Sequence, residues 1–596
     1  MLTKKGFYKK EGEHSPQESY ARATNCFSFG DLELSQRLYD AVSRQWFTFA
    51  SPVLSNAVLH EYPEDLKFSE VREYLKKNVK ASGLPISCFL SYIPDTREGL
   101  VDTASETRYL SMNGGGVGIY AGMRAVDEKS TGVMAHMRTY DADAQAYKQG
   151  ETRRGSYAAY LPVDHPEIMN FLEMRSPVGG DPNQKCFNLN NAINITDDFM
   201  FKLANGEDYE LVDPKHGKTG RFLSTKEVWE KIIEIRKDTG EPYLNFIDTI
   251  NRAIPKHITN PAYKVVQSNL CNEIHLMTNS ERTAVCCLSS LNLDKYDEWK
   301  DTTLVADLVR MLDNVLEYFI ALAPDTISRA KFSAEQERAI GLGTLGFASY
   351  LQRHGIPFES GGFNSAVQKN HIIYKNIKRQ AVEESLVLGK ERGVPSDCEG
   401  SGMRNSHLMA IAPNASSSSM VNVSPSIEPF AGIAFTAQGR SGSFLIKNTH
   451  FERLMDHYAG LWDKDDNWKQ RQWNKIVADD GSVQSLDWLT DHEKKVFKTA
   501  SEIDQRWVIE HAAVRQPEIC QGQSLNLAIS PDLTHDDVSY LHWLAWKKGC
   551  KGLYYYRSAS KVKAKVSGDG TTKPLNAVAV KPNYQQDDGA CLACEG

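Results

Sequence analysis

The sequence predicts an α/β protein in which strands and helices alternate. From about residue 85 onward, short apolar runs alternate with Gly-rich turns and amphipathic segments. The composition is that of an ordinary globular protein, with 41% hydrophobic and 24% charged residues in a chain of 596. Strands that alternate with helices favour parallel pairing within one sheet.

Residues 1–80 are predicted to form a small helical N-terminal domain. Ser15 is a suitable N-cap, Pro16 suits the first helical position, and Glu18 makes the first turn acidic. Apolar residues then recur at helical spacing, at Leu34, Leu38, Val42 and Trp46.

Residues 81–557 are predicted to form the main domain. Its expected strands are 86–92, 117–121, 157–161, 284–288, 408–411 and 552–556. Ser224 and Glu227 have the spacing of a capping box, and Gly240 ends the helix that follows. The segment 301–323 is apolar on most faces, which indicates a buried helix. The Gly-rich segment 114–118 lacks the Lys and Ser or Thr of a phosphate-binding loop, so it predicts close backbone packing instead.

Residues 558–596 are predicted to form a flexible tail that ends in a Cys-x-x-Cys pair. The segment has no hydrophobic periodicity, and it carries Cys591 and Cys594 within its last six residues. Such a pair is half of a zinc site, a mobile redox dithiol, or without a role. No second Cys-x-x-Cys exists in the chain to complete a zinc site. A mobile dithiol requires a second dithiol in the body of the protein that is oxidised in each turnover.

Charge and cysteine usage exclude several classes of protein. The net charge of −7 gives no broad surface for nucleic acid. The N-terminus has no apolar segment of a signal peptide, and no apolar run reaches the length of a membrane span. Eleven cysteines in a chain of this length do not make a disulfide scaffold, so we expect reduced thiols and a cytoplasmic location.

Three cysteines of the main domain stand in contexts that suggest chemistry. Cys88 and Cys286 lie in apolar runs that are typical of buried strands, whereas Cys271 lies in a polar segment between Asn269 and Glu273. A thiol between an amide and a carboxyl group is typical of a catalytic site. The other body cysteines are interpreted as small core residues, namely Cys26, Cys186, Cys287, Cys398, Cys520 and Cys550.

The motif Asn269-x-Cys271-x-Glu273, with Cys88 before it, Cys286 after it and a C-terminal dithiol, resembles the large catalytic subunit of class I ribonucleotide reductase. The resemblance implies a ten-stranded α/β barrel whose centre is threaded by a finger loop. It also implies that Cys271 becomes a thiyl radical at the loop tip and abstracts the 3′ hydrogen of the ribonucleotide. Glu273 would be the base for the 3′ hydroxyl, and Asn269 would hydrogen-bond the substrate.

The same resemblance implies how the electrons are supplied. Cys88 and Cys286 would provide two reducing equivalents and finish as a disulfide. Cys591 and Cys594 would reduce that disulfide by thiol exchange and would be restored by thioredoxin or glutaredoxin.

Three consecutive tyrosines precede the tail. Tyrosine is common in strands, so packing alone would explain them. In the family, two adjacent stacked tyrosines relay the radical, and Tyr554 and Tyr555 match them best. A relay implies that this subunit has no radical cofactor of its own and that a metal-containing β subunit supplies the radical.

A Ser-rich loop follows the run 408–411 and offers hydroxyl and backbone N–H groups for a phosphate. In the family the matching loop binds the diphosphate of the nucleoside diphosphate substrate. Here it comprises Asn414, Ala415, Ser416, Ser417 and Ser418, and Ser51 and Ser87 match further contacts. Some relatives carry Glu where this chain has Ala415, which affects side-chain contacts of the loop.

A second nucleotide site is implied for an effector. Asp95 and Arg124 match residues that contact the sugar and the phosphates of a dNTP or ATP, bound with Mg²⁺ at the interface of an α homodimer. Arg153 and Arg154 match the loop that carries the signal to the substrate. Many relatives begin with an ATP-binding cone, which we expect to be absent here, so dATP should not inhibit through such a domain.

Two other functions remain to be weighed. A glycyl-radical enzyme on a related barrel would carry a C-terminal radical glycine motif, where this chain has cysteines. A non-enzymatic protein with a zinc or redox tail would leave Asn269, Cys271 and Glu273 unexplained. For the reductase, the expected location is the cytoplasm, or the host cytoplasm if the chain is viral.

Overall fold

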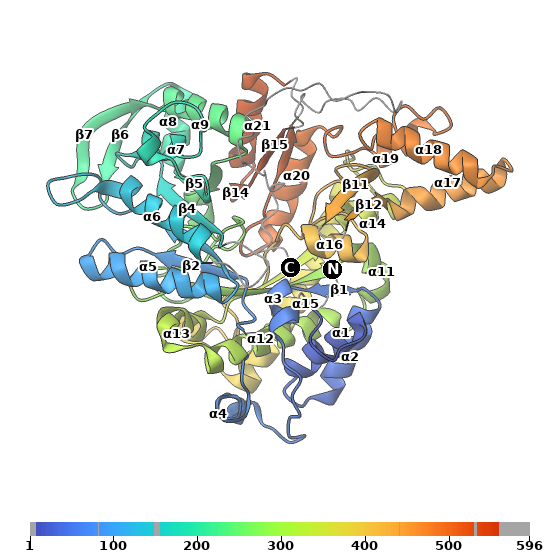
Figure 1. The fold of residues 1–596 in the computed structure, drawn as a ribbon, viewed down its shortest axis with the longest axis horizontal. Coiled ribbons are helices and arrows are strands. Elements are labelled where there is room, and N and C mark those ends of the chain that lie inside the picture. The colour runs from blue at the N-terminus through green and yellow to red at the C-terminus, as the bar shows by residue number, and fades with distance from the viewer. Residues whose placement is uncertain (1–7, 82, 148–154, 440–441, 530–532, 559–596) are drawn as a thin grey trace.

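The computed structural model describes residues 8–81, 83–147, 155–439, 442–529 and 533–558. The strands of its main sheet are β1 (Phe47–Phe49), β2 (Cys88–Tyr92), β3 (Gly116–Tyr120), β4 (Tyr157–Pro162), β5 (Leu189–Ile195), β8 (Tyr243–Phe246), β9 (Ala284–Asn292), β10 (Ile340–Leu345) and β14 (Gly552–Leu553). They form one curled sheet at the centre of the molecule, surrounded by helices (Figure 1). The tail cysteines Cys591 and Cys594 and the pair Arg153 and Arg154 lie outside the described residues.

The sheet has the order β1-β9-β2-β3-β4-β5-β8-β14, and β10 adds to β9. The run from β2 through β3, β4 and β5 to β8 is parallel throughout. The long strand β9 joins this run to the rest of the sheet. It pairs antiparallel with β2 through its first residues, and through its later residues it pairs antiparallel with β1 and parallel with β10. The α/β class expected from the sequence is therefore confirmed.

Three small sheets stand apart from the main one. They are β6 (Asp208–Asp213) with β7 (Gly217–Ser224), β11 (Ala434–Gly439) with β12 (Gly442–Lys447), and β13 (Leu527–Ile529) with β15 (Tyr556–Ser558). The last pair is parallel, and its second strand, β15, begins three residues after the end of β14.

Four of the expected strands are confirmed with small changes in their ends, as β2, β3, β4 and β9. The expected strand 408–411 is wrong, because this segment meets its neighbours only at isolated bridges, from Met409 to Leu342 and from Ile411 to Gln523. The expected strand 552–556 is divided, since the chain leaves β14 at Leu553 and joins another sheet at Tyr556. The described sheet therefore has nine strands, and the expected number of ten is not confirmed.

Helices cover the sheet. The longer ones are α1 (Pro16–Cys26), α2 (Leu32–Ser43), α4 (Phe68–Asn78), α5 (Arg97–Met112), α6 (Gly132–Ala146), α8 (Asp197–Asn205), α9 (Thr225–Thr239), α12 (Leu304–Leu322), α13 (Ser328–Glu337), α15 (Ala366–Arg392), α17 (Thr449–Leu461), α18 (Asp466–Ala478), α20 (Gln505–Arg515) and α21 (His535–Lys547). The shorter ones are α3 (Ser51–Asn56), α7 (Ile168–Glu173), α10 (Ile247–Arg252), α11 (Tyr296–Trp299), α14 (Phe347–Arg353), α16 (Ala415–Val421) and α19 (Asp491–Val496). Among the described helices, none is long and apolar enough to span a membrane.

The helix ends follow the local signals in the sequence. Ser224 caps α9 by accepting a hydrogen bond from the amide of Glu227, and Gly240 ends the helix with φ of 84°. The apolar stripe of α2 is buried as expected, but the helix ends at Ser43. Trp46 therefore lies outside the helix, where β1 is about to begin, and its assignment to the helical stripe is wrong.

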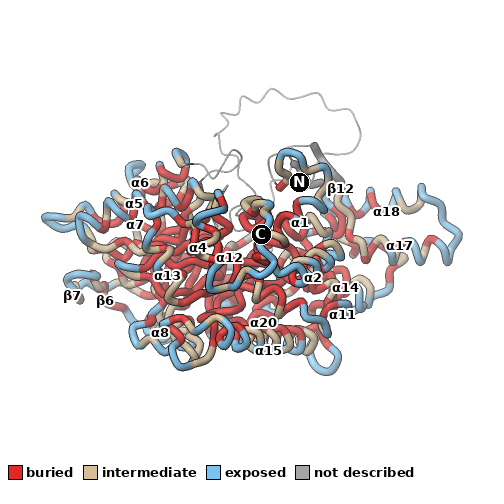
Figure 2. The backbone as a smooth tube through the Cα atoms, turned by 90° about the horizontal axis from the view of Figure 1, so that it is seen from below, coloured by how far each residue is buried: buried red, intermediate tan, exposed pale blue. Residues whose placement is uncertain are grey.

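Most of the buried apolar residues belong to one core that spans the sheet and the N-terminal helices. A second core lies under α17, α18 and α19, and it includes Phe451, Trp473 and Phe497. Figure 2 shows that buried residues concentrate in the centre, whereas α17 and α18 extend from the body with exposed outer faces. The centre of the curled sheet is thus the best shielded part of the protein.

Candidate active site

Cys88 and Cys286 lie opposite each other on the neighbouring strands β2 and β9. They are register partners in an antiparallel pair, and both are fully buried and reduced. Partners in such a pair have Cα atoms about 4.5–5.5 Å apart, which is within the range that a disulfide spans. Burial is the main cause that raises the pKa of Cys286 well above its usual value, and the nearby thiols of Cys287 and Cys88 raise it further. The pair can therefore close a disulfide with little movement of the backbone, and Cys286 stays a thiol until it is oxidised.

Cys287 points the other way. Its Sγ lies 3.4 Å from the carbonyl oxygen of Leu312 in α12, on the opposite face of β9. The prediction that Cys287 faces away from Cys286 and is structural agrees with this contact, because side chains alternate along a strand.

Asn269, Cys271 and Glu273 lie in a buried loop between α10 and β9, which we call the finger loop (residues 265–278). All three are fully buried. The side chain of Asn269 braces the loop, since its Oδ1 accepts hydrogen bonds from the amides of Glu273 at 3.0 Å and Ile274 at 3.1 Å. Its Nδ2 donates to Cys88 Sγ at 3.3 Å, and that sulfur lies 4.0 Å from Glu273 Oε1. An amide, a carboxyl group and a redox thiol thus meet at one point.

The finger loop passes close to the backbone of several strands. A Cβ atom at Gly118 of β3 would lie 2.0 Å from the carbonyl oxygen of Ser268, and one at Gly552 of β14 would lie 2.6 Å from Asn272 Nδ2. Tyr160 of β4 donates its hydroxyl to the carbonyl oxygen of Asn269 at 2.5 Å. The close backbone packing predicted for residues 114–118 is confirmed at Gly118. These contacts come from different strands, so the loop lies inside the curve of the sheet.

Sequence reasoning missed two polar residues that contact this loop. The hydroxyl of Ser524 lies 2.6 Å from the carbonyl oxygen of Cys271 and 2.9 Å from Glu273 Oε2. The amide of Gln521 donates to Cys286 Sγ at 3.5 Å, and its oxygen accepts from the amide of His275 at 3.2 Å. Their sequence context, Gln-Gly-Gln-Ser, has no apolar period and gave no signal by itself.

Tyr554 and Tyr555 lie between β14 and β15 and form an aromatic cluster with Tyr243 of β8. The centroids of the adjacent pair are 4.4 Å apart, and the rings are tilted by 56° rather than stacked. The ring centroid of Tyr243 lies 4.6 Å from that of Tyr554 and 5.1 Å from that of Tyr555. Tyr243 was not predicted from the sequence. Tyr554 is fully buried, whereas Tyr555 is partly exposed. Burial is the main cause that raises the pKa of Tyr243 well above its usual value. The neighbouring Tyr555 raises this pKa further, and Cys271 makes a smaller contribution in the same direction. The cluster thus reaches from the edge of the protein towards the finger loop.

The expected substrate loop lies near the end of β9. Asn414 has φ of 54° and precedes α16, and its Oδ1 accepts a hydrogen bond from Ser290 at 3.2 Å. Ser416, Ser417 and Ser418 are buried in α16, and the Ser417 hydroxyl has no hydrogen-bond partner among the described residues. Ala415 begins the helix and offers no side-chain polar group.

The other two expected substrate residues lie on neighbouring elements. Ser51 begins α3 directly after β1 and shares a hydrogen bond of 2.7 Å with Tyr8. Ser87 precedes Cys88, and its hydroxyl lies 3.6 Å from the Cys88 sulfur. Register places all three along β9, because Ser51 follows the partner of Ser289 and Ser87 precedes the partner of Cys286. Asn414 of the loop is bonded to Ser290 of the same strand.

Two of the expected effector residues, Asp95 and Arg124, form a partly buried ion pair. Arg124 Nε lies 3.5 Å from an Asp95 carboxylate oxygen and 3.7 Å from one of Asp127. Asp127 was not predicted, and its position beside Arg124 limits the positive charge that Arg124 can offer to a phosphate. Arg153 and Arg154 lie outside the described residues, so their part in an effector site stays a prediction.

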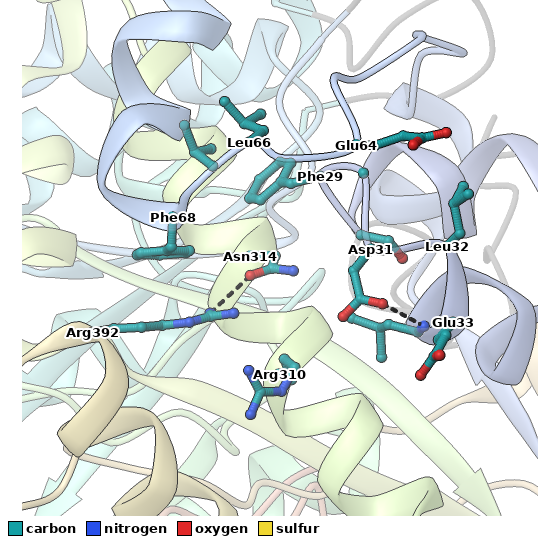
Figure 3. Close-up of a pocket in the computed structure, with 14 residues that line it drawn as sticks. Phe29, Asp31, Leu32, Glu33, Glu64, Leu66, Phe68, Arg310, Asn314 and Arg392 are labelled. Atoms are coloured by element: carbon teal, nitrogen blue, oxygen red, sulfur yellow. Dashed lines mark hydrogen bonds between the residues drawn. The ribbon is translucent and has the colours of Figure 1, made fainter.

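A cavity of about 500 Å³ lies elsewhere, between the start of α2 and the helices α12 and α15 (Figure 3). The two arginines that line this cavity, Arg310 and Arg392, already pair with acidic side chains. Arg392 bonds Asp313 and Asn314 and lies over the Phe68 ring, and Arg310 pairs with Glu384 and Glu391. The residues expected to react do not line this cavity, so we do not place the reaction there.

Comparisons with known proteins agree with this site. The family model "Ribonucleotide reductase, barrel domain" matches residues 86–400 and 394–556. A protein of Frog virus 3 (isolate Goorha) is 46% identical over 97% of this chain and 95% of its own. The "Ribonucleoside-diphosphate reductase large subunit" of Invertebrate iridescent virus 3 is 42% identical over 99% of this chain and 97% of its own.

A solved structure is also similar. It is the "Actinobacillus ureae class Id ribonucleotide reductase alpha subunit", which matches with a TM-score of 0.78 and 33% identity. The match covers 93% of this chain and 95% of that one. The predicted α/β barrel is therefore confirmed, although its strand number is not.

Proposed function

We propose how the residues of this chain carry out its reaction, from the premise that the chain belongs to the ribonucleotide reductase family. As a large subunit of that family, it reduces ribonucleoside diphosphates to 2′-deoxyribonucleoside diphosphates. Cys271 abstracts the 3′ hydrogen as a thiyl radical, Glu273 accepts the proton of the 3′ hydroxyl, and Asn269 orients the substrate. Cys88 and Cys286 give up two protons and two electrons and finish as a disulfide. The substrate loses its 2′ hydroxyl as water and gains a hydrogen at C2′, and Cys271 returns the 3′ hydrogen.

The observation that carries this proposal is the meeting of Cys88 with Cys286, Asn269 and Glu273. Cys88 faces Cys286 in register, while its sulfur contacts the Asn269 amide and lies near the Glu273 carboxyl group. Separate segments of the chain supply these groups at fully buried positions, where water is excluded. A packing role alone would not require a carboxyl group beside two thiols in an apolar sheet.

We propose that the radical reaches Cys271 from outside through Tyr555 and then Tyr554. The short centroid distance and the decrease in exposure from Tyr555 to Tyr554 support this direction. A large subunit implies a small partner subunit, and a metal-containing β subunit is the proposed source of the radical. A glycyl-radical enzyme is not favoured, because the family model and the relatives belong to ribonucleotide reductases.

The remaining assignments complete the proposal. Ser51, Ser87 and the loop from Asn414 to Ser418 would hold the substrate diphosphate. The buried Ser417 hydroxyl supports such a site, because it has no hydrogen-bond partner within the described part of the chain. Asp95 and Arg124, with Arg153 and Arg154, would bind a dNTP or ATP effector with Mg²⁺ in an α homodimer. Cys591 and Cys594 would pass electrons from thioredoxin or glutaredoxin to the body.

The Cys271→Ser variant tests the proposal, with Cys287→Ser as the matched control. We expect Cys271→Ser to lower turnover of a ribonucleoside diphosphate by at least about a thousandfold, as removal of other catalytic nucleophiles does. Turnover is measured with β subunit, effector and dithiothreitol present. Cys287→Ser changes a buried thiol on the other face of β9 and should retain activity. Full turnover by Cys271→Ser would refute the proposal.

A further inference from the structure

Ser524 is a fully buried residue of a segment that lies along the finger loop. The amide of Gly522 donates to the carbonyl oxygen of Glu273 at 2.7 Å, and the amide of Ser524 donates to the carbonyl oxygen of Ile411 at 2.9 Å. This segment, residues 521–526, is thus held by backbone hydrogen bonds on both sides. These bonds fix the backbone of Ser524, and the short side chain then leaves its hydroxyl few possible positions.

The two contacts of the Ser524 hydroxyl set a constraint on protons. Its Oγ lies 2.6 Å from the carbonyl oxygen of Cys271, which can only accept, so Ser524 must donate its one proton there to form that bond. Oε2 of Glu273 lies 2.9 Å from the same Oγ. A carboxylate can also only accept, whereas a carboxylic acid can donate. Both hydrogen bonds are therefore complete only when Glu273 is protonated and donates to Ser524.

We propose that Ser524 is a positioning residue that links the protonation of Glu273 to the backbone of Cys271. While Glu273 is a carboxylate, the two oxygens compete for the single hydroxyl proton. Once Glu273 holds a proton, it donates to Ser524, and Ser524 donates to the Cys271 carbonyl. No proton leaves the three groups in this exchange. The inference rests on the proposed role of Glu273 as the base.

The same segment also holds the tyrosine pair. The amide of Tyr554 donates to the carbonyl oxygen of Leu525 at 2.8 Å, and that of Tyr555 donates to Asn526 Oδ1 at 3.0 Å. Ser524 is adjacent to these acceptors in the chain. One short segment therefore contacts the proposed radical donor, the backbone of Cys271 and the base, and Ser524 makes the last two contacts.

The pH dependence of kcat/KM for a ribonucleoside diphosphate tests the inference in the variants Ser524→Ala, Ser524→Thr and Ser268→Ala. Ser524→Ala should lower kcat/KM by roughly three- to tenfold, because the neutral hydrogen bonds to protonated Glu273 and to the Cys271 carbonyl are lost. Loss of the acceptor disfavours the protonated form of Glu273, so the acid limb of the profile should move to lower pH. Ser524→Thr keeps the hydroxyl and should keep the wild-type profile.

Ser268→Ala is the matched control in the finger loop. The Ser268 hydroxyl lies 2.8 Å from the carbonyl oxygen of Ile274 and 3.3 Å from Asn269 Oδ1, and it has no contact with the Glu273 carboxyl group among the described hydrogen bonds. Its loss should lower activity without moving the acid limb. An unchanged profile in Ser524→Ala, or an equal shift in Ser268→Ala, would overturn the inference.

Folding and the role of Glu273 are tested separately. Circular dichroism and thermal midpoints establish that each variant is folded, and if Ser524→Ala does not fold, a folded Ser524→Thr with a shifted profile would overturn the inference. Glu273→Gln distinguishes the two levels of the argument. Full activity of Glu273→Gln would refute the proposed function itself, whereas an inactive Glu273→Gln beside an unshifted Ser524→Ala would refute only the role of Ser524.

Discussion

The side chain of Asn269 shows how one residue serves both structure and chemistry. Its oxygen is used by two loop amides, and its nitrogen contacts the Cys88 sulfur. A carboxyl group in place of this amide would have no proton to donate to the sulfur, and a hydrophobic residue would leave the two amides without their acceptor. The amide is thus the group that suits both tasks at this buried position.

Glu337, a buried acid away from the site, gives a prediction at the same scale. Burial raises the pKa of Glu337 to about 7, although Tyr263 and Ser333 donate hydrogen bonds to it. An unfolded Glu titrates near 4.3, so the folded state keeps a proton that the unfolded state has released. This difference lowers stability as pH rises from about 4.5 to 7.

We therefore expect the free energy of unfolding of Glu337→Gln, taken relative to that of wild type, to increase by roughly 2–3 kcal/mol from pH 5 to pH 8. The free energy of unfolding in urea, measured at both pH values, checks this. The control Glu70→Gln changes an exposed carboxyl group and should show little dependence on pH. A difference between Glu337→Gln and wild type that stays constant with pH would contradict the prediction.

The finger loop is the element on which the site depends, and glycine in the surrounding strands lets it enter. Gly118 of β3 and Gly552 of β14 both lie against loop atoms at distances that no Cβ could occupy. Neither position has a φ that requires glycine for conformational reasons. Their role is to leave space for the loop.

Gly118→Ala should therefore displace the finger loop. The new Cβ would lie 2.0 Å from the carbonyl oxygen of Ser268, so the backbone must move, at a cost of about 1–3 kcal/mol. Misplacement of Cys271 should lower kcat by roughly a hundredfold. Turnover and the thermal midpoint of the variant measure the two effects.

Gly460→Ala in α17 provides the comparison. A Cβ there meets no atom within 4 Å, and the residue is helical, so the change should stabilise the helix by up to about 1 kcal/mol and leave turnover intact. Wild-type activity of Gly118→Ala would show that the loop does not need this passage.

At the scale of the whole molecule, the barrel isolates the cysteine pair from solvent. Cys88 and Cys286 are fully buried, and neither lines the cavity of Figure 3. A protein reductant cannot reach such a disulfide directly, so a carrier must bring electrons in. The tail pair Cys591 and Cys594 is the carrier that we propose.

The double variant Cys591→Ser with Cys594→Ser tests this. We expect about one deoxynucleotide per chain in a single round, loss of steady-state turnover with thioredoxin, and partial recovery with dithiothreitol, since small thiols reach sites that proteins cannot. Product per chain, measured with each reductant, checks the result. Glu595→Gln changes the same tail without removing a thiol and should behave as wild type. Unchanged turnover of the double variant with thioredoxin would exclude the tail as carrier.

Local sequence signals determined much of this protein. The caps of α9, the buried helix α12 and the strands β2, β3, β4 and β9 could be predicted, because hydrophobic period and capping are local properties. The finger loop was implied only by the resemblance that its motif carries. The motif around Cys271 also identified the family, and the comparisons confirm it.

Only the tertiary structure decided which groups meet. The register of β2 against β9 places Cys88 opposite Cys286, although nearly 200 residues of chain separate them. The same holds for three residues that the sequence did not indicate, namely Ser524, Gln521 and Tyr243. Each contacts the site through a partner that is distant in sequence, and the residues around it in the chain give no sign of that contact. The failed strand at 408–411 is a further example, because a short apolar run becomes a strand only when its neighbours offer a continuous ladder. Pairing across the sheet is a long-range property, and it was this pairing that turned a set of separate cysteines and polar residues into a site.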